Sequence, residues 1–541
     1  MRRGRPLPLR TPGDYSHVMA DTKREIERKY ESRDGRLPDL TGVPDVTTIA
    51  DRGVAHLDAT YYDTADERLA AASITLRRRT GGSDAGWHLK FPVSPGVRDE
   101  IHAPLSDDLP DALARLVRSR VRDRALTPLV RLRSDRDVRH LLDRDGRLLA
   151  EVSVDTVHAE RLTGHGGTAH WTEIEVELAD DGDPAFLDHV DRHLRDAGLT
   201  PSASSSKLAR ALTTTAPAAT APRSPAAAAP APAPSPAAAP KKKRRTRPVG
   251  EPVTAGDHVL AYVRAQRDAL VELDPAVRQD VPDAVHRMRV ATRRLRSTFR
   301  SFRSVLHRDT TDPIGADLKW LAGELGLERD QEVLAERLTT ALDRLPDDLV
   351  RGPVRDRLAA WSGARRSSAH GHVTGVLDSA RHLALLDSLD ALLADPPLRK
   401  KAHAKPAKVL TRAVRKDLDK LSGLVTTALE LPPGHDRDLA LHDARKKTKR
   451  TRYAAEAAVP ALGGTAKDLV KVMKSLQELL GDHQDSVMAR RTLRELAAVA
   501  HAAGEDTFTY GVLHAREERR AELTEAALPD TWRSITRGIA L

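Results

Sequence analysis

Charged residues alternate along the stretch EIERKY at residues 25–30. In an extended chain, successive side chains point to opposite faces, so Glu25, Glu27 and Lys29 share one face. A solvated strand face is the usual meaning of such a pattern. The same row also has a chemical use, because carboxylates bind hard divalent cations and an amine binds phosphate oxygens. Other segments of the chain decide between these two interpretations.

Several other short alternating segments also carry a charged row opposite an apolar row. These rows are Arg77 with Arg79 in SITLRRRT, His88 with Lys90 in WHLKF, Arg98 with Glu100 in VRDEI, and Glu173, Glu175 and Glu177 in TEIEVEL. A barrel that packed its apolar rows outward against helices would enclose a lumen containing both carboxylates and cations. Hydrolysis of a phosphoanhydride needs these groups to neutralise charge, hold a metal ion and position water.

Composition limits the classes of protein to which the chain can belong. Its 541 residues allow two to four domains, and the absence of Cys excludes disulfides, thiolate metal sites and Cys nucleophiles. No segment approaches the roughly 18 to 20 apolar residues of a membrane span, so we expect no membrane partner and a soluble cytoplasmic protein. Seven Lys and Arg residues between positions 217 and 248 account for seven of the ten net positive charges, which leaves +3 for the rest.

The sequence divides into four segments. Residues 1–20 are expected to be a loose leader, and residues 213–250 an Ala/Pro-rich basic linker. Residues 21–212 contain the alternating segments, with helical patterns near 107–124 and 184–198, and residues 251–541 show helical spacing throughout. We therefore expect a multidomain α+β protein, with an N-terminal antiparallel β tunnel barrel and flanking helices followed by an all-α region.

A cationic stripe marks the helical region and recurs downstream. His286, Arg289, Arg293, Arg296 and Arg300 fall at i, i+3, i+7, i+10 and i+14, beside a mostly apolar stripe that begins at Val285. The same offsets recur 156 positions later, at His442, Arg445, Lys449 and Arg452. LGLERDQEV (325–333) likewise matches LGDHQDSVM (480–488), with Asp330 matching Asp485. The two matches predict a duplicated bundle of four helices.

The first region resembles the CYTH superfamily, the triphosphate tunnel metalloenzymes. The resemblance covers residues 22–212 and includes EIERK, YYDT, LRRR, WHLKFP, AEVSVD, EIEVEL and SSSKL. It implies an eight-stranded antiparallel tunnel that uses Mg²⁺ or Mn²⁺. Family members include inorganic, thiamine and RNA triphosphatases and class IV adenylyl cyclases. No segment predicts an adenine pocket, so cyclase activity is the weaker option.

The CYTH resemblance also assigns candidate residues. The expected metal-side carboxylates are Glu25, Glu27, Asp155, Glu173, Glu175 and Glu177. The expected triphosphate-binding cations are Lys29, Arg77, Arg79, Lys90, Arg136 and Lys207. Arg131 and Arg133 are alternatives to Arg136. Glu25, Glu27 and Lys29 form the expected catalytic row.

The second region resembles the CHAD domain over residues 255–535, through HRMRVATRRLR, LGLERD, HDARKKTKRTRY and LGDHQD. That family implies symmetric four-helix bundles with a basic surface that binds inorganic polyphosphate. The expected polyphosphate-binding residues are His286, Arg289, Arg293, Arg294, Arg296, Arg300, Lys408, Arg412, His442, Arg445, Lys446, Lys449 and Arg452. Nucleic acid is a weaker partner, because among aromatic residues only Tyr453 adjoins a stripe.

Two functions therefore stay open. The chain is expected to bind polyphosphate or tripolyphosphate and to hydrolyse it in the barrel with Mg²⁺ or Mn²⁺. The alternative is a non-catalytic polyphosphate-binding protein associated with polyphosphate granules. Metal binding by His286 and His442 is disfavoured, because neither is paired with carboxylates at metal-ligand spacing. Oligomeric state does not follow from the sequence.

Overall fold

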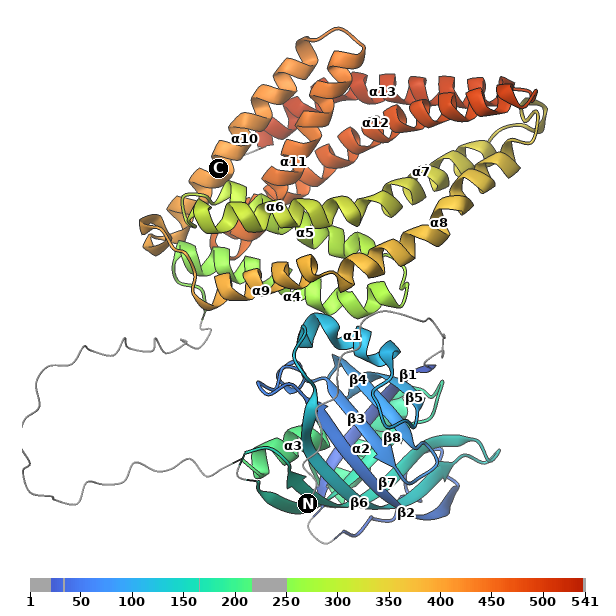
Figure 1. The fold of residues 1–541 in the computed structure, drawn as a ribbon, viewed down its shortest axis with the longest axis vertical. Coiled ribbons are helices and arrows are strands. Elements are labelled where there is room, and N and C mark those ends of the chain that lie inside the picture. The colour runs from blue at the N-terminus through green and yellow to red at the C-terminus, as the bar shows by residue number, and fades with distance from the viewer. Residues whose placement is uncertain (1–20, 33–34, 165, 217–250, 539–541) are drawn as a thin grey trace, which may run out of the picture. The chain divides into compact units, whose positions relative to one another are not determined.

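The computed structural model describes residues 21–32, 35–164, 166–216 and 251–538. They form two compact units, one before and one after residues 217–250, and each unit is described by itself (Figure 1). The expected leader and residues 217–250 of the expected linker lie outside the described residues. Within the described part of the chain, no helix is long and apolar enough to cross a membrane.

The first unit is a closed ring of antiparallel strands (Figure 1). Its strands are β1 (Asp21–Ser32), β2 (Thr48–Asp63), β3 (Thr75–Thr80), β4 (Gly86–Ser94), β5 (Val97–Pro104), β6 (Thr127–Leu142), β7 (Leu148–Arg161), β8 (Thr168–Leu178) and β9 (Thr200–Pro201). The order around the ring is β1–β5–β4–β3–β2–β6–β7–β8, and β8 returns to β1. The short β9 pairs with the end of β1. The expected eight-stranded antiparallel tunnel is thus confirmed.

The ring closes where β1 changes partner. Residues 21–26 of β1 pair with β5, and residues 27–32 pair with β8. At the changeover, the backbone N–H of Glu27 donates to the carbonyl oxygen of Gly96 at 2.8 Å. A Cβ at Gly96 would lie 2.7 Å from the carbonyl oxygen of Glu27, and Gly96 has a φ of +73°. Only glycine fits this turn, which holds the charged row of β1 against its neighbours.

Helices α1 (Asp111–Val121) and α2 (Pro184–Asp196) cover the outer surface of the ring, whereas α3 (Lys207–Thr214) packs against inward-facing residues of the strands, among them Tyr61 and Trp171. The apolar rows of β1, β7 and β8 pack with Phe186 and Val190 of α2. Those of β3, β4 and β5 pack with Leu113 and Val117 of α1, and Leu208 of α3 joins a third apolar cluster. The apolar rows that pack against α1 and α2 face outward as expected, so the charged rows of these strands face the interior.

The second unit is entirely helical. It contains α4 (Ala255–Arg278), α5 (Ala284–Ser301), α6 (Arg308–Glu324), α7 (Gly326–Asp343), α8 (Val354–Asp378), α9 (Ala380–Ala394), α10 (Pro406–Glu430), α11 (His435–Leu462), α12 (Gly464–Ala502) and α13 (Phe508–Gly538). A capping box formed by Thr254 and Asp257 begins α4. Helices α10, α11 and α12 follow one another as antiparallel neighbours (Figure 1).

The duplication predicted from the sequence corresponds to an interleaved fold. Helices α4 and α5 match α10 and α11, the pair α6–α7 matches the continuous α12, and α8–α9 matches α13. One hydrophobic cluster joins Leu295 of α5 to Leu421 of α10, and a second joins Leu338 of α7 to Leu493 of α12. Each cluster therefore contains residues from both repeats, so the two repeats bury their apolar faces against each other.

Candidate functional site

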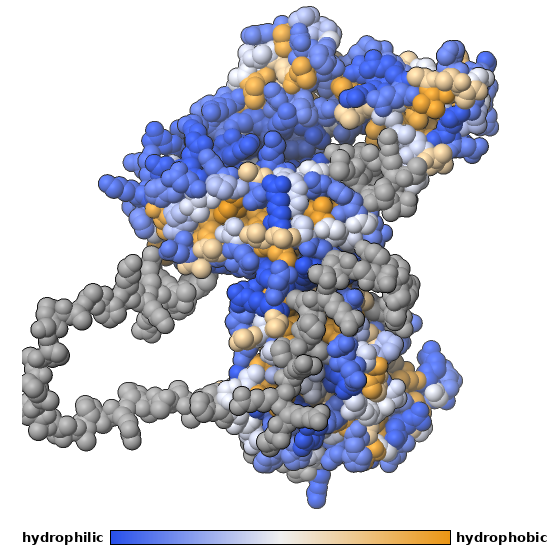
Figure 2. Space-filling view, in the orientation of Figure 1, coloured by the Kyte–Doolittle hydropathy of each residue, from blue (hydrophilic) through white to orange (hydrophobic). Residues whose placement is uncertain are grey.

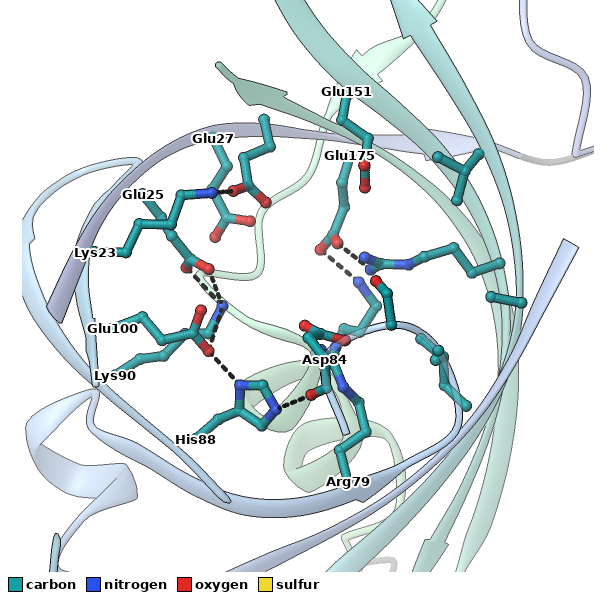
Figure 3. A pocket seen from close by; sticks show the side chains of 18 of the residues that line it. Lys23, Glu25, Glu27, Arg79, Asp84, His88, Lys90, Glu100, Glu151 and Glu175 are labelled. Carbon is teal, nitrogen blue, oxygen red and sulfur yellow. Dashed lines mark hydrogen bonds and ion pairs between the residues drawn. The ribbon is translucent and has the colours of Figure 1, made fainter. Parts of the chain in front are cut away.

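The ring encloses a cavity of about 810 Å³ whose wall carries the charged rows (Figure 3). Its lining includes nine Lys and Arg side chains and eight Asp and Glu side chains. Every strand from β1 to β8, helix α3 and the turns that contain Asp84 and Asp180 contribute these residues. The positive and negative charges of the lining nearly balance. The eight carboxylates would therefore repel a polyanion that entered without accompanying cations. Divalent cations bound by those carboxylates would remove that repulsion.

The row on β1 faces cations from neighbouring strands. Nζ of Lys90 lies 2.7 Å and 2.5 Å from the two carboxylate oxygens of Glu25, and 3.5 Å from Oε1 of Glu100. Burial raises the pKa of Glu25 to about 7. Oε2 of Glu27 lies 3.0 Å from Nζ of Lys29. Burial opposes ionisation of Glu27, but the charge of Lys29 outweighs it and lowers the pKa of that carboxyl.

A second group of carboxylates is more deeply buried. Asp155, Glu173 and Glu175 place their oxygens within 4.8 Å of one another. Nζ of Lys207 lies 2.9 Å from Asp155, 2.9 Å from Glu173 and 2.5 Å from Glu175. Arg136 donates two parallel hydrogen bonds of 2.8 Å to Asp155 and a third of 2.8 Å to Glu175. The positive charges that neutralise this buried acidic cluster thus come from side chains of the protein, Lys207 and Arg136.

The charges within this cluster stabilise one another. Burial disfavours the ionised carboxylates, but Lys207 and Arg136 outweigh it and hold the pKa of Asp155 and Glu175 below the ordinary values. Burial likewise disfavours the ammonium of Lys207, whose pKa is nevertheless raised by Asp155, Glu173 and Glu175. The first residue of α3 is Lys207, and its position is fixed by Ser206, whose hydroxyl accepts from the backbone N–H of Ala209.

These carboxylates fit a hard divalent cation in donor type. Glu25, Glu27 and Glu175 line the cavity, whereas Asp155 and Glu173 are buried beside Glu175 and do not line it. Glu177 also lines the cavity, and its Oε1 lies 3.0 Å from Nζ of Lys23. The expected metal-side carboxylates therefore form one row on β1 and one group on β7 and β8, and Lys29 joins them by pairing with both Glu27 and Glu175.

The expected triphosphate-binding cations all line the cavity. Arg77 donates to the hydroxyl of Tyr61 at 3.3 Å, and Arg79 forms an ion pair with Asp84 (Figure 3). Burial lowers the pKa of Arg79 to about 9, and the nearby charge of Arg77 adds to the shift. Arg136 rather than Arg131 faces the cavity, because Arg131 donates to Asp58 at 2.9 Å outside its lining.

Several residues of the cavity were not candidates from the sequence. These residues are Lys23, Arg52, Tyr61, Asp84, Glu151 and Asp180. The alternation that identified Glu25 extends back to Lys23, so that residue could have been found. Tyr61 lies in the YYDT segment, where the pattern indicated a strand without assigning the hydroxyl a role. Glu151 shares one face of the AEVSVD segment with Asp155, so alternation could have found it as well. Asp84 and Asp180 lie in turns, and Arg52 lies in a part of β2 that the pattern did not single out.

In the helical unit, the two cationic stripes meet. The apolar stripe of α5 is buried at Met288, Thr292, Leu295 and Phe299, as the spacing predicts. Burial lowers the pKa of Lys449 on α11 to about 7, and the charges of Arg445, Arg293 and Arg289 lower it further. Arg289 and Arg293 belong to α5, so cations from both helices gather at one place. We call Arg289, Arg293, Arg445 and Lys449 the central cation cluster.

The central cation cluster repeats the internal symmetry of the fold. The guanidinium of Arg289 lies beside Gly326, where a Cβ would be 3.0 Å from Nη2. Arg445 lies in the same way beside Gly481, where a Cβ would be 3.7 Å from its Nε. The matched glycines of LGLERD and LGDHQD thus leave room for the matched arginines. Asp485 faces Arg445 and Lys449, whereas the side chain of Asp330 lies outside the described residues.

Other candidate residues lie apart from this cluster. Arg294 and Arg452 both form ion pairs with Glu456, at 3.0 Å and 2.9 Å, and Lys446 pairs with Asp443 at 2.9 Å. Lys408 and Arg412 are exposed on α10, where the visible surface is largely hydrophilic (Figure 2).

Both histidines that begin the cationic stripes are half-buried. His286 lies near the start of α5. Burial lowers the pKa of His442, despite a hydrogen bond with Gln484.

Comparison with known proteins identifies both units. Residues 23–212 match the family model of the CYTH domain, and residues 261–494 match that of the CHAD domain. The chain belongs to the CYTH–CHAD proteins. Two uncharacterized proteins from strains of Mycobacterium tuberculosis are each 37% identical over 548 residues, covering 96% of this chain and 98% of their own.

Solved structures resemble parts of the CYTH–CHAD chain. PptA from Streptomyces chartreusis is 25% identical, with a TM-score of 0.45, and the match covers 52% of this chain and 99% of that one. The CHAD domain of the plant Ricinus communis is 26% identical, with a TM-score of 0.41, over 51% of this chain and 92% of that one. A putative adenylyl cyclase from Hippeastrum, described as having a dominant triphosphatase activity, is 19% identical with a TM-score of 0.23, over 37% of this chain and 98% of that one.

Proposed function

We propose that this CYTH–CHAD protein binds inorganic polyphosphate through its CHAD domain and hydrolyses a phosphoanhydride bond of tripolyphosphate, or of a polyphosphate end, in its CYTH ring. The observation that carries the proposal is the single cavity in which carboxylates on β1 and β8 face Lys and Arg side chains on β3, β4 and β6. Phosphoryl transfer depends on charge neutralisation and positioning, and this cavity supplies groups for both.

The cations of the chain bind and orient the substrate in this proposal. Arg77, Arg79 and Arg136 offer planar guanidinium groups that can bind phosphate oxygens bidentately, and Lys29, Lys90 and Lys207 offer point charges. Lys90 and Lys29 now contact Glu25 and Glu27, so phosphate binding would require them to exchange partners. Polyphosphate can compete for these lysines once the carboxylates bind another cation.

Mg²⁺ or Mn²⁺ is the cofactor that the carboxylates fit. Glu25, Glu27 and Glu175 are the proposed ligands, because they line the cavity, with Asp155, Glu173 and Glu177 as further candidates. A bound divalent ion would neutralise the charge that develops on the phosphate oxygens and would polarise the bond to be cleaved. The chain itself excludes bulk water and holds the phosphates at fixed positions in the ring.

Phosphate release tests the proposal. Tripolyphosphate and long-chain polyphosphate are incubated with the full chain and Mg²⁺ or Mn²⁺, and the wild type is compared with the Glu25→Ala, Glu27→Ala double variant. We expect metal-dependent release in the wild type and a loss of at least about 100-fold in the double variant, as for removal of groups that stabilise a transition state.

Glu31→Gln is the matched control. Glu31 belongs to the same row of β1, but it accepts from Ser202 at 2.5 Å, pairs with Arg210 at 2.6 Å and does not line the cavity. Its variant should retain release within about threefold, since it keeps a hydrogen-bonding side chain there. Wild-type protein that binds polyphosphate but releases no phosphate would reject the hydrolase proposal.

A non-catalytic polyphosphate-binding protein, associated with polyphosphate granules in the cytoplasm, is the second candidate. It is supported by Lys207, which already neutralises Asp155, Glu173 and Glu175 without a metal ion. The central cation cluster would then carry the whole function. Nucleic acid is disfavoured as the ligand, because Tyr453 is buried and both Arg294 and Arg452 lie over its ring.

A further inference from the structure

The two repeats of the CHAD domain differ in charge at one position of the cationic stripe. The offset of 156 that relates His286 to His442 also relates Arg300 of α5 to Glu456 of α11. The helices contact each other reciprocally at these positions. Arg294 of α5 reaches Glu456, and Arg450 of α11 reaches the carbonyl oxygen of Arg300 at 2.8 Å. The symmetric pair of helices thus carries opposite charges at its two equivalent ends, Arg300 on α5 and Glu456 on α11.

At one end, Glu456 neutralises the nearby cations. Its Oε2 lies 3.0 Å from Nε of Arg294 and accepts from the hydroxyl of Tyr262 at 3.0 Å. Its Oε1 lies 2.9 Å from Nη1 of Arg452, whose Nε donates to Gln477 at 3.0 Å. Both guanidinium groups are therefore committed to neighbours within the fold.

At the other end, cations accumulate. Arg300 and Arg303 are exposed, and Nη1 of Arg399, also exposed, lies 3.5 Å from the carbonyl oxygen of Arg303. Among the described residues, neither Arg296 nor Arg300 forms an ion pair, and Nε of Arg296 is buried without a hydrogen-bond partner. The acid at this end is Asp417, which pairs with Lys447 and lies 3.3 Å from Nε of Arg450.

We infer that a linear polyphosphate chain leaves the central cation cluster in one direction only, over Arg296 and Arg300, because Glu456 closes the equivalent path on α11. This inference rests on the proposed binding of polyphosphate. A chain running toward Arg300 meets successive cations that the fold leaves available. A chain running the opposite way meets Glu456, which repels phosphate and holds Arg294 and Arg452.

The length of the polyphosphate chain determines whether it reaches beyond the central cation cluster. A short polyphosphate is neutralised within the central cation cluster, whereas a longer one gains contacts only where further cations are available. Each phosphate neutralised by a Lys or Arg releases condensed counterions and steepens the dependence of affinity on salt. The gain in affinity on lengthening the chain therefore depends on Arg300 and not on Arg452.

The experiment measures binding of the full chain to tripolyphosphate and to long-chain polyphosphate across a salt series. EDTA is present, so that metal-dependent hydrolysis does not consume the ligand. The variants are Arg300→Gln, the control Arg452→Gln at an arginine that Glu456 already neutralises, Glu456→Gln, and the charge exchange Arg300→Glu with Glu456→Arg. Circular dichroism melting verifies that each variant is folded. The exchange keeps the net charge unchanged, so an altered affinity cannot come from total charge.

For long chains, we expect Arg300→Gln to weaken binding by about three- to tenfold and to reduce the salt slope by roughly 0.7, the value for one contact to a single-stranded polyanion. Arg452→Gln should change the affinity by less than about twofold, as for a cation already neutralised by its neighbour. Glu456→Gln should strengthen binding, and the charge exchange should retain it within about threefold, because the path is moved to the other helix. Tripolyphosphate affinity should be the same in all variants.

Equal losses in Arg300→Gln and Arg452→Gln would overturn the inference, as would an unchanged affinity in Glu456→Gln. These results differ from failure of the proposed function, in which wild-type protein binds no polyphosphate at all. A folded charge-exchange variant that binds tripolyphosphate but has lost the gain for long chains would also contradict a path defined by charge alone.

Discussion

Nζ of Lys207 lies 2.5 Å from Oε1 of Glu175, at the centre of the buried acidic cluster formed with Asp155 and Glu173. The lysine comes from the first turn of α3 and the glutamate from β8, so one ammonium joins this helix to the strands of the ring. The contact has both structural and functional consequences. It stabilises three buried carboxylates, and it occupies the place where an external cation would bind them.

Replacing Lys207 with Met should therefore destabilise the CYTH ring. The change leaves the three carboxylates with Arg136, Arg210 and Lys29 as cationic neighbours, and removing one partner of a buried ion pair costs about 3–5 kcal/mol. Urea unfolding at neutral pH measures the loss. Lys23→Met is the control, because its ammonium pairs with Glu177 at the half-exposed mouth of the cavity, and it should cost less than about 1 kcal/mol. Similar losses in both variants would contradict this account of the cluster.

Metal binding should depend on pH through Glu25. Burial raises the pKa of this carboxyl to about 7, so below that pH a proton competes with the divalent ion. The apparent Mn²⁺ affinity of the wild type should rise by up to about tenfold per pH unit below the pKa and level off above it. Titration calorimetry from pH 6 to pH 8 measures the rise. Glu25→Gln should bind Mn²⁺ more weakly with a flatter profile, and an equally steep profile in that variant would contradict the assignment.

Polyphosphate binding should have the opposite dependence on pH because of Lys449. Burial and the neighbouring Arg445, Arg293 and Arg289 lower the pKa of this ammonium to about 7. A bound polyanion would raise that pKa again, so binding takes up protons: the full affinity is present below pH 7 and declines as the pH rises through 7. Calorimetry in two buffers of different ionisation enthalpy measures the uptake near pH 7.5. Lys449→Arg should bind without proton uptake, and uptake that persists in this variant would assign it to another group.

Alanine at the two matched glycines should have different effects. A Cβ at Gly326 would lie 3.0 Å from Nη2 of Arg289, whereas a Cβ at Gly481 would lie at the ordinary contact distance of 3.7 Å from Arg445. Gly481→Ala, inside α12, should stabilise the protein by roughly 0.5–1 kcal/mol and leave polyphosphate affinity unchanged. Gly326→Ala should displace Arg289 and weaken polyphosphate binding. Thermal melting and binding titrations measure both quantities, and equal affinities in the two variants would refute the steric argument.

Much of the ring could be predicted from the sequence, because alternation assigns each side chain to one of two faces. The row of Glu25, Glu27 and Lys29 lies in the cavity, and the apolar rows lie under the helices, as expected. The extent of β2 and β6 was not predicted. Most residues in the first half of β2 are exposed, so no apolar row marks that part of the strand.

Which residues meet across the fold could not be predicted from periodicity. The spacing places Arg452 in the same stripe as Lys449, but Arg452 is held by Glu456 one helical turn further on. Similarly, Glu173, Glu175 and Glu177 share one face of β8 but have different partners. Lys207 contacts the first two, whereas Lys23 contacts the third. Such partners depend on the register between distant strands and helices, which no single segment contains.

The most direct test of the proposed hydrolase is a phosphorus-31 NMR spectrum of tripolyphosphate incubated with the wild-type protein, with Mg²⁺ and then with excess EDTA. The account predicts that pyrophosphate and orthophosphate appear together in equal amounts with Mg²⁺, and that neither appears with EDTA. Tripolyphosphate that stays intact with Mg²⁺, while its resonances still broaden on binding, would contradict hydrolysis and leave the CYTH ring as a binding module.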